Sequence, residues 1–318
     1  MINEPRNQPG EPRTKGLEPI ADMLVRKQKK PAGLSTQKTT PNQKTEPGPC
    51  ECKMCGESFH GEITTYYFVD PPRVISDSEC PACREKVESA ENEAAEKERR
   101  LKVLALRESW IDTCGIPTVF QTIRFRHLDS FYQAKTQNIC RKWAESFVVE
   151  DPAASRSMML YSATPGVGKT VLMSCMAAHI IDNWVGDPER SRCPVKFISG
   201  PEMVRRVRAT YDAPDGQRHE RETDVYKELG GVGLLMLDDV GKEQPRSYRF
   251  TQEMYWYIID ARVKAGLPVV LNSRRYLTGE DSLEQLMGVD TVDRLYGMTG
   301  GQMTEITGKS YRRLKKIP

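Results

Sequence analysis

The residues best suited to chemistry in this sequence form a phosphate-binding loop. Residues 163–170 read Ala-Thr-Pro-Gly-Val-Gly-Lys-Thr, between an apolar run at 157–162 and an apolar helical pattern that follows. In such a loop, backbone N–H groups surround phosphate oxygens, the lysine reaches the β- and γ-phosphates, and the hydroxyl coordinates Mg²⁺. The spacing therefore predicts an ATP and Mg²⁺ site formed by Pro165, Gly166, Val167, Gly168, Lys169, Thr170 and Val171.

Two carboxylates follow a second apolar run, at residues 234–237. A buried parallel strand delivers the residues at its end to the carboxyl edge of the sheet, where Asp238 can hold Mg²⁺ through water. Asp239 is suited to orient or deprotonate the attacking water. We expect Lys169 and Asp238 to meet around a magnesium-bound triphosphate, at adjacent strand tips of one sheet.

A polar cluster follows a further apolar run, at 269–271. Asn272, Ser273 and Arg274 are placed to sense the γ-phosphate or to hold the attacking water, and we take Asn272 as the catalytic candidate. The sequence does not distinguish among the three residues, and simple turn chemistry is the alternative.

Four cysteines form two CxxC pairs, Cys52 with Cys55 and Cys80 with Cys83, separated by 24 residues. Each pair can point two thiolates at one ion, so the spacing predicts a tetrahedral Zn²⁺ site in a ribbon at residues 50–83. A segment this short needs a metal for its folding energy. Cys50 and His60 are possible substitutes for one ligand, and free structural cysteines are the alternative reading.

The elements that must position these groups alternate between strand and helix patterns. Apolar runs predict strands at 157–162, 195–199, 234–237, 268–272 and 303–307, with helices at 170–184, 201–211, 250–265 and 282–287. Alternation of this kind predicts an α/β domain with a five-stranded parallel sheet at residues 111–318.

The segments before this domain differ in composition. Residues 1–49 are rich in proline and poor in large apolar residues, which predicts a disordered tail. Within it, Leu17, Ile20, Met23 and Leu24 recur at helical spacing, as a chance cluster or as a short helix that folds on a partner. Residues 84–110 are highly charged and contain no Gly or Pro, so they predict a solvated helical linker.

Composition excludes several classes of protein. With 38% hydrophobic and 29% charged residues, the sequence has no run near the about 18 apolar residues of a membrane helix. We expect no membrane partner. The N-terminus does not resemble a secretory signal, and nine cysteines without one indicate a reducing, cytoplasmic location. The net charge of +3 requires any nucleic-acid site to be a local patch.

Residues 112–314 resemble the DnaC/IstB branch of the AAA+ ATPases, which comprises helicase loaders and transposase helper ATPases. The resemblance rests on the phosphate loop and on five further segments in the same order: 115–129, 197–208, 237–241, 293–295 and 308–312. It implies an AAA+ ATPase that loads a replicative DNA helicase, self-assembles through its AAA+ domains and contacts single-stranded DNA.

The resemblance also implies roles for individual residues. Arg294 matches the family's arginine finger, which acts on the nucleotide of a neighbouring subunit, and Arg262 matches a family arginine whose role the sequence leaves unassigned. A helix that lines the DNA path in related proteins corresponds here to the segment with Arg205, Arg206, Arg208 and Tyr211. Three arginines and an aromatic residue suit a single-stranded backbone and its bases, and a solvated helix face is the alternative.

Two other functions remain open at this stage. One is an IstB-like ATPase that assembles on duplex DNA and activates a transposase. The other is a zinc-ribbon binding module on a domain that senses nucleotide without turnover, because Ala163 and Asp239 stand where glycine and glutamate are more usual. Partner identity, bacterial or phage origin, subunit number and whether the ribbon binds protein or DNA are not specified by the residues.

Overall fold

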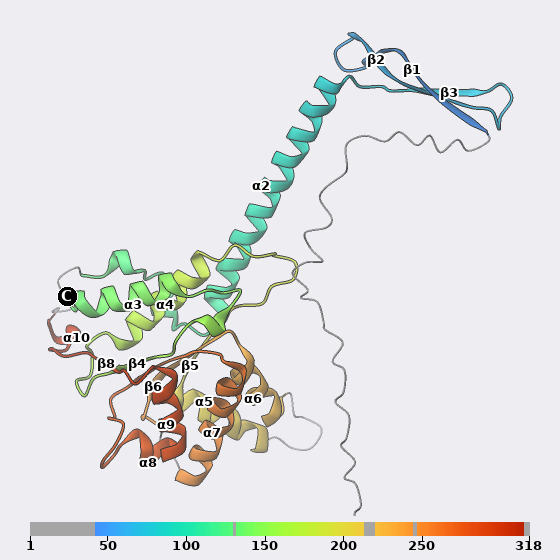
Figure 1. The fold of residues 1–318 in the computed structure, drawn as a ribbon. Helices are drawn as coiled ribbons and strands as arrows, with labels where there is room; N and C mark the ends of the chain where they lie inside the picture. The colour runs from blue at the N-terminus through green and yellow to red at the C-terminus, as the bar shows by residue number, and fades with distance from the viewer. Residues whose placement is uncertain (1–41, 130–131, 213–219, 244–246, 315–318) are drawn as a thin grey trace, which may run out of the picture. The chain divides into compact units, whose positions relative to one another are not determined.

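The computed structural model describes residues 42–129, 132–212, 220–243 and 247–314 (Figure 1). The chain divides into two compact units, Met1–Ala90 and Glu91–Pro318. The short helix expected around Leu17 and Leu24 lies outside the described residues, as does most of the expected tail.

The smaller unit contains a three-stranded antiparallel sheet. Its strands are β1 (Gln43–Glu51), β2 (Ser58–Tyr66) and β3 (Arg73–Ser76), in the order β1-β2-β3. Strand β1 starts within the segment that the sequence predicted as tail, and it contains Pro47 and Pro49. Proline is tolerated there because β1 is an edge strand, where a missing N–H group breaks no ladder on the outer side.

Helix α2 (Pro81–Thr113) is longer than the predicted linker helix at both ends. Proline suits the first turn of a helix, whose N–H groups have no partner within the helix. Towards its C-terminal end, Val103, Trp110 and Ile111 are buried in the core of the larger unit, where the Trp110 ring meets Trp184 at 4.7 Å between centroids. The core of the α/β domain therefore includes residues that lie before position 111, where the sequence predicted the domain to begin.

The larger unit is built on a five-stranded sheet in which every pair of neighbouring strands is parallel. The strand order is β5-β6-β7-β4-β8. This confirms the predicted fold class, an α/β domain with a five-stranded parallel sheet that follows a small ribbon. The strands are β4 (Met158–Tyr161), β5 (Val195–Ser199), β6 (Leu234–Val240), β7 (Val269–Ser273) and β8 (Thr304–Glu305).

Both faces of the sheet are covered, which gives three layers. Successive residues of a strand point to opposite faces, so Leu234 and Met236 enter one buried cluster while Leu235 and Leu237 enter the other. The first cluster is completed by α2, α3 (Ala134–Ser146) and α4 (Lys169–Asp182). The second is completed by α5 (Gly200–Asp212), α6 (Glu222–Gly231), α7 (Tyr248–Ala265), α8 (Leu283–Met287) and α9 (Val289–Met298).

The remaining elements are short: η2 (Thr118–Phe120), η3 (Phe125–His127), η4 (Pro152–Ala154) and α10 (Tyr311–Leu314). Sequence periodicity did not predict α3, α6 or α9. Each buries few apolar side chains, and α6 ends in two glycines, so none of them contains the continuous apolar stretch by which the other helices were recognised.

Arg262 holds three chain segments together inside the larger unit, a set of contacts that we call the Arg262 clamp. Its side chain is fully buried, and its guanidinium donates to the carbonyl oxygens of Leu229 (2.9 Å), Val232 (2.8 Å), Gly233 (3.3 Å) and Pro268 (2.6 Å). These carbonyls belong to the end of α6 and to the segments that lead into β6 and β7. Burial lowers the pKa of Arg262 to about 9. The residue therefore has a structural role, which the sequence left unassigned.

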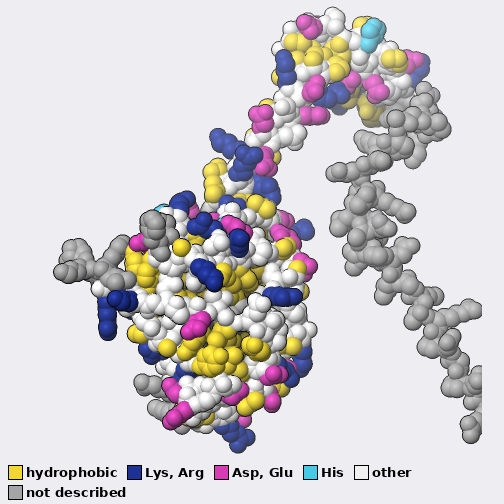
Figure 2. Space-filling view, turned by 60° about the vertical axis from the view of Figure 1, so that its left-hand side comes forward, with side chains coloured by type: hydrophobic (Ala, Val, Ile, Leu, Met, Phe, Trp, Pro, Cys, Tyr) yellow, Lys and Arg dark blue, Asp and Glu magenta, His cyan; other side chains and the backbone are white. Residues whose placement is uncertain are grey.

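Charged side chains of both signs are interspersed on the face of the larger unit shown in Figure 2, without a continuous basic surface. This agrees with the net charge of +3. No helix in the described ranges combines the length and the apolar character that crossing a bilayer requires.

Candidate functional site

The predicted phosphate loop connects β4 to α4. Gly166 and Gly168 have φ values of 77° and 97°, and Gly168 precedes the first residue of α4, which is Lys169. A side chain at position 166 would lie 2.2 Å from the Ser310 hydroxyl, so both the backbone conformation and the close approach require glycine. This loop presents the N-terminus of a 14-residue helix, a favourable place for phosphate oxygens.

Lys169 is held against its own loop. Its side chain is 6% exposed, and its Nζ donates to the Ser162 carbonyl oxygen at 3.1 Å. Burial lowers the pKa of Lys169 to about 8, and the nearby Asp239 carboxylate opposes that shift. The Asp239 charge offsets only part of the cost of burying the charged ammonium group. A phosphate bound beside Lys169 would therefore stabilise the charged form.

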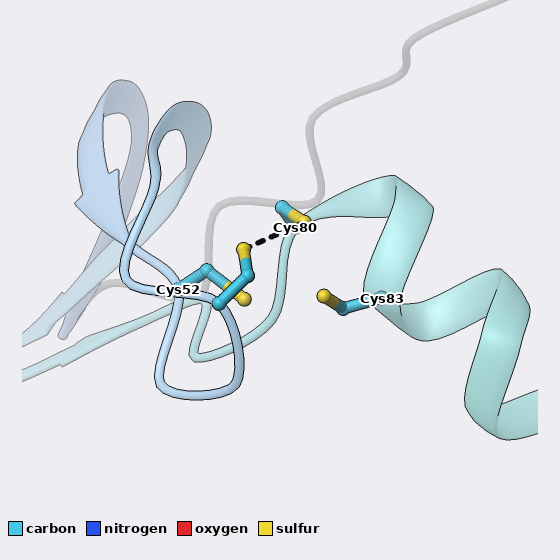
Figure 3. Close-up of side chains that lie close together, drawn as sticks. Cys52, Cys80 and Cys83 are labelled. Carbon is cyan, nitrogen blue, oxygen red and sulfur yellow. Dashed lines mark hydrogen bonds between the residues drawn. The ribbon is translucent and has the colours of Figure 1, made fainter.

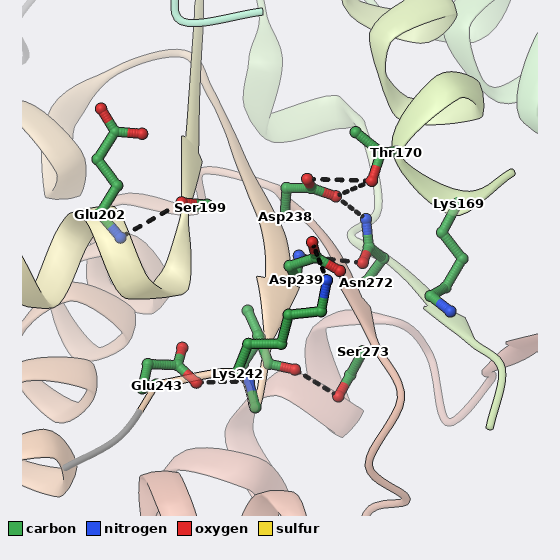
Figure 4. Close-up of polar contacts among 12 residues, drawn as sticks. Lys169, Thr170, Ser199, Glu202, Asp238, Asp239, Lys242, Glu243, Asn272 and Ser273 are labelled. Carbon is green, nitrogen blue, oxygen red and sulfur yellow. Dashed lines mark hydrogen bonds and ion pairs between the residues drawn. The ribbon is translucent and has the colours of Figure 1, made fainter. Parts of the chain in front are cut away.

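Thr170 and Asp238, which the sequence assigned to the same Mg²⁺ site, are in direct contact. The Thr170 hydroxyl contacts the two Asp238 carboxylate oxygens at 2.9 and 3.1 Å (Figure 4). Burial raises the pKa of Asp238, while the hydrogen bonds from Asn272 and Thr170 act in the opposite direction. A hydroxyl and a carboxylate side by side at the loop fit the oxygen ligands that Mg²⁺ prefers, directly or through water.

The expectation that the tips of adjacent strands carry Lys169 and Asp238 is wrong. Strand β7 lies between β4 and β6 in the sheet. Sequence order does not reveal this insertion, because parallel strands are joined by crossovers that can skip a position.

The inserted strand places Asn272 between the two motifs (Figure 4). Its amide nitrogen donates to the Asp238 carboxylate, and its amide oxygen accepts the Asp239 N–H at 3.1 Å. Ser273 instead donates to the Val240 carbonyl oxygen at 2.7 Å, while Arg274 lines the cavity described next. Of the three polar residues considered from sequence, Asn272 is the one that holds both carboxylate-bearing residues in place.

A cavity of about 390 Å³ adjoins the loop, and the loop residues from Pro165 to Leu172 line it together with Asp239 and Arg274. A second part of its wall comes from chain segments for which the sequence gave no role. They contribute the apolar or aromatic side chains of Val119, Phe120, Ile123, Leu128 and Tyr132 and the polar side chains of His127, Asp129, Gln133 and Gln137. A cavity with one cationic end and one wall of mixed apolar and polar side chains fits a nucleotide.

Residues 308–312, near the end of the described chain, lie against the phosphate loop. The Tyr311 N–H donates to the Gly166 carbonyl oxygen at 2.9 Å, and the Tyr132 hydroxyl donates to the Lys309 carbonyl oxygen at 2.7 Å. Tyr311 and Arg312 also line the cavity. Sequence reasoning noted residues 308–312 through the resemblance and did not place them here, since nothing local links them to a loop more than a hundred residues earlier.

Asp239 adopts a left-handed backbone conformation, with φ of 51°, where the pairing of β6 with β7 is irregular. Its carboxylate pairs with Lys242 Nζ at 2.5 Å. Lys242 also lines the nucleotide-sized cavity, and the sequence analysis did not select it. The sequence did contain a signal for Lys242, because it is a cationic residue three positions after the predicted catalytic acid, Asp239.

Arg294 lies on α9 and does not line the cavity. Its guanidinium pairs with the Asp260 carboxylate and lies over the Trp256 ring, 4.0 Å from the centroid. Within one copy of the chain it is thus held on the outer surface of α7 and α9.

The predicted DNA-contacting residues divide into two groups on α5. Arg205 is exposed, Arg208 lies 5.5 Å over the Phe250 ring, and Tyr211 is 53% exposed. Arg206 differs, because its guanidinium pairs with the carboxylates of Glu220 and Glu228. Arg206 is therefore engaged within the fold, whereas Arg205 is exposed and Arg208 and Tyr211 are partly covered by the Phe250 ring.

The four predicted zinc ligands come together in the smaller unit, and Figure 3 labels three of them, Cys52, Cys80 and Cys83. Their sulfur atoms all lie within 4.8 Å of one another, and Cys55 Sγ is 3.8 Å from Cys80 Sγ. Tetrahedral Zn²⁺ with bonds of about 2.3 Å separates its sulfur ligands by about 3.8 Å, so the cluster fits the ion. Backbone N–H groups of Cys80 and Cys55 lower the pKa of Cys52 to about 6, whereas the neighbouring Cys80 and Cys55 thiols raise the pKa of Cys83, so Cys52 ionises before Cys83. Cys50 and His60 are not part of the cluster.

Comparison with known proteins gives weak similarities. No family model matches the sequence. A DnaC helicase loader structure is 18% identical with a TM-score of 0.45, over 60% of this chain and 100% of that one. A DnaI structure is 15% identical with a TM-score of 0.44, over 60% and 94%. The replication initiator DnaA bound to AMPPCP and single-stranded DNA is 17% identical with a TM-score of 0.43, over 61% and 52%.

Proposed function

We propose that this chain is a cytoplasmic, ATP-dependent loader of a replicative DNA helicase. In this proposal the α/β domain binds and hydrolyses ATP, assembles with other copies and contacts single-stranded DNA. The order of motifs across residues 112–314, which resembles the helicase-loader branch of the AAA+ ATPases, supports this role.

The observation that carries the ATPase proposal is the set Thr170, Asp238 and Asn272 beside a cavity lined by the phosphate loop. Mg²⁺, when bound here, would neutralise charge on the β- and γ-phosphates. Lys169 binds the phosphates, and Asn272 fixes the orientation of the Asp238 carboxylate. Asp239 orients the attacking water and accepts its proton.

Arg294 is proposed to complete the site of a neighbouring copy. It lies outside the cavity of its own chain, on a surface that a second copy can reach. Its half-buried pair with Asp260 would hold the guanidinium in a fixed orientation before assembly. An arginine supplied in this way stabilises the charge that develops during phosphoryl transfer.

The ribbon is proposed to bind a protein, namely the helicase, instead of DNA. Residues 42–83 contain seven acidic and three basic residues, which disfavours a phosphate backbone. Exposed apolar side chains lie around the turn after β2, including Tyr67 and Phe68, which are 56% and 65% exposed. An exposed apolar patch of this kind is typical of a protein-binding surface.

Two measurements test the proposal. ATP turnover by the full chain should require Lys169, so Lys169→Ala should abolish it. A pull-down with the cognate hexameric helicase should capture the full chain, and loading onto single-stranded DNA should require ATP. ATP-dependent filaments on duplex DNA without helicase affinity would instead indicate a transposase helper.

One observation favours a second function, nucleotide sensing without turnover. Asp239 is paired with Lys242 in this structure, so its carboxylate is already engaged by a cation and is not free to orient the attacking water. Tight ATP binding with no phosphate release under any condition, including saturating single-stranded DNA, would support that function.

A further inference from the structure

Four polar side chains lie in the second wall of the nucleotide-sized cavity, and they differ in burial. His127 and Asp129 are exposed and Gln133 is half-buried, whereas Gln137 on α3 is only 8% exposed. A buried polar side chain that lines a cavity beside apolar neighbours is the kind of group that fixes the orientation of a ligand. Gln137 is therefore the polar residue of this wall best placed to recognise one.

The amide group of Gln137 has one fixed orientation. Its Nε2 donates to the Asp129 carbonyl oxygen at 2.7 Å and to the Tyr132 carbonyl oxygen at 2.5 Å. An amide nitrogen has two hydrogens and a backbone carbonyl can only accept, so the amide cannot be turned over without losing both bonds. The polar atom that remains is Oε1, which can only accept a hydrogen bond.

This oxygen is available to a ligand. No donor in the described ranges reaches it, since both hydrogen bonds of the side chain are made by Nε2. Three side-chain atoms in those ranges are fully buried without a partner, and Gln137 Oε1 is not among them. It follows that Oε1 is open to the cavity that Gln137 lines.

The two ends of the cavity suit the two ends of a nucleotide. Lys169, Lys242 and Arg274 line the part that adjoins the phosphate loop, which leaves the wall with Gln137 for the base. The Tyr132 ring, 4.7 Å from the Tyr311 ring, lines this part as well. Apolar and aromatic side chains can cover the faces of a base, while a few polar groups recognise its edge.

Purine bases differ in what they present at position 6. Adenine carries an amino group there, which donates, whereas guanine and hypoxanthine carry an oxygen, which accepts. An acceptor fixed at Gln137 Oε1 completes a hydrogen bond with the amino group. With an oxygen in the same place, two acceptors face each other and both stay unpaired, which is costly inside a cavity.

We propose that Gln137 determines the base specificity of the site. Its Oε1 accepts a hydrogen bond from the 6-amino group of adenine, which selects ATP over nucleotides with a 6-oxopurine base. The phosphate loop cannot make this selection, because its contacts are to phosphates that all nucleoside triphosphates share. This inference rests on the proposed ATP-binding function.

The test compares three triphosphates as competitors of a fluorescent ATP analogue bound to the full chain, in the presence of Mg²⁺. Purine riboside triphosphate lacks the 6-amino group and should bind about tenfold more weakly than ATP, as expected for one lost hydrogen bond. Inosine triphosphate carries an oxygen at position 6 and should bind about a hundredfold more weakly than ATP.

The variant Gln137→Met separates base recognition from a structural role. It should reduce the preference for ATP over each of the two analogues to about onefold, because the acceptor is gone. Loss of the two bonds to the backbone alone would weaken all three triphosphates by the same factor and leave their ratios unchanged.

The matched control is Gln121→Met. Gln121 also donates its amide N–H to a backbone carbonyl, that of Ile116 at 3.4 Å, but it does not line the cavity. This variant should keep the wild-type ratios. A wild-type chain that takes up no nucleotide analogue would contradict the proposed function. Equal affinities of the wild type for the three triphosphates, or unchanged ratios in Gln137→Met, would overturn the role of Gln137 while leaving ATP binding intact.

Discussion

The ribbon and the α/β domain differ in how their sites relate to their cores. In the ribbon, the buried cluster consists of Cys52, Cys80 and Cys83 with Phe59 packed on it, so the metal ligands are themselves the core. In the α/β domain, two large apolar clusters lie on the faces of the sheet, and the polar site occupies its carboxyl edge. A site that is also the core cannot be altered without unfolding, whereas a site beside a core can be altered separately.

The largest effect is expected in the ribbon. Cys80→Ser removes a thiolate from a site whose metal supplies the folding energy, on the order of 10 kcal/mol for comparable small zinc domains. We expect loss of bound zinc and rapid proteolysis within residues 42–83, with ATP affinity of the larger unit unchanged. Zinc content, limited proteolysis and calorimetry check this. Cys50→Ser is the control, since Cys50 lies outside the cluster; if the Cys80→Ser ribbon resisted protease, the comparison would fail.

A smaller effect is expected in the core of the α/β domain. Arg262→Met removes the guanidinium donor from four carbonyl oxygens, two of them in fully buried hydrogen bonds. Unsatisfied buried acceptors cost about 1–3 kcal/mol each, partly offset by removal of a buried charge. We therefore expect the free energy of unfolding to fall by about 2–4 kcal/mol with nucleotide affinity retained. Denaturant unfolding tests this against Arg249→Met, an exposed position on the same helix; equal stabilities of the two variants would contradict the clamp.

The pH dependence of nucleotide affinity should report on the site alone, because it depends on the charge of Lys169 and not on packing in the core. The pKa of Lys169 is lowered to about 8 by burial, and a bound phosphate would raise it again. Below pH 8 the lysine is charged in both states, so affinity should be flat; above pH 8, binding must take up a proton, and affinity should fall by up to tenfold per pH unit. Calorimetry of ATP binding in buffers of different ionisation enthalpy would detect this proton uptake at pH 9, and its absence there would exclude the shift.

The smallest expected effect is the change in the free energy of unfolding when the Lys169 charge is removed. Because the folded-state pKa of Lys169 lies below the ordinary value of 10.5, the charged lysine destabilises the fold below pH 8, and this penalty disappears as the pH rises through 8 towards 10.5. Lys169→Met should therefore stabilise the nucleotide-free chain at pH 7, by about 1 kcal/mol, while weakening ATP binding. Thermal unfolding at pH 7 and pH 10 measures the difference; a variant less stable at pH 7 would show that this site residue also supports the core.

Much of the fold was accessible from the sequence because its signals are local. The run that became β5 was predicted with its observed bounds, and the phosphate loop and the CxxC pairs were identified from spacing alone. The predicted bounds of β6 were less accurate, because the polar residues Asp238 and Asp239 interrupt the apolar run and the strand continues through them to Val240. Strand β1 was missed because its prolines argue against a strand unless the strand lies at the edge of a sheet, and the sequence does not show which strands are edges.

The sequence by itself determined which groups are available for chemistry: the loop that ends in Lys169 and Thr170, the acids at the end of β6, and four thiols in two pairs. Each is a short-range pattern in which residue type and spacing fix the local geometry. Only the tertiary structure decided that β7 separates β4 from β6, that Asn272 therefore holds Asp238, and that Tyr311 lies against the phosphate loop. These relations depend on strand order and on which segments share a wall, and both follow from packing between elements distant in the chain.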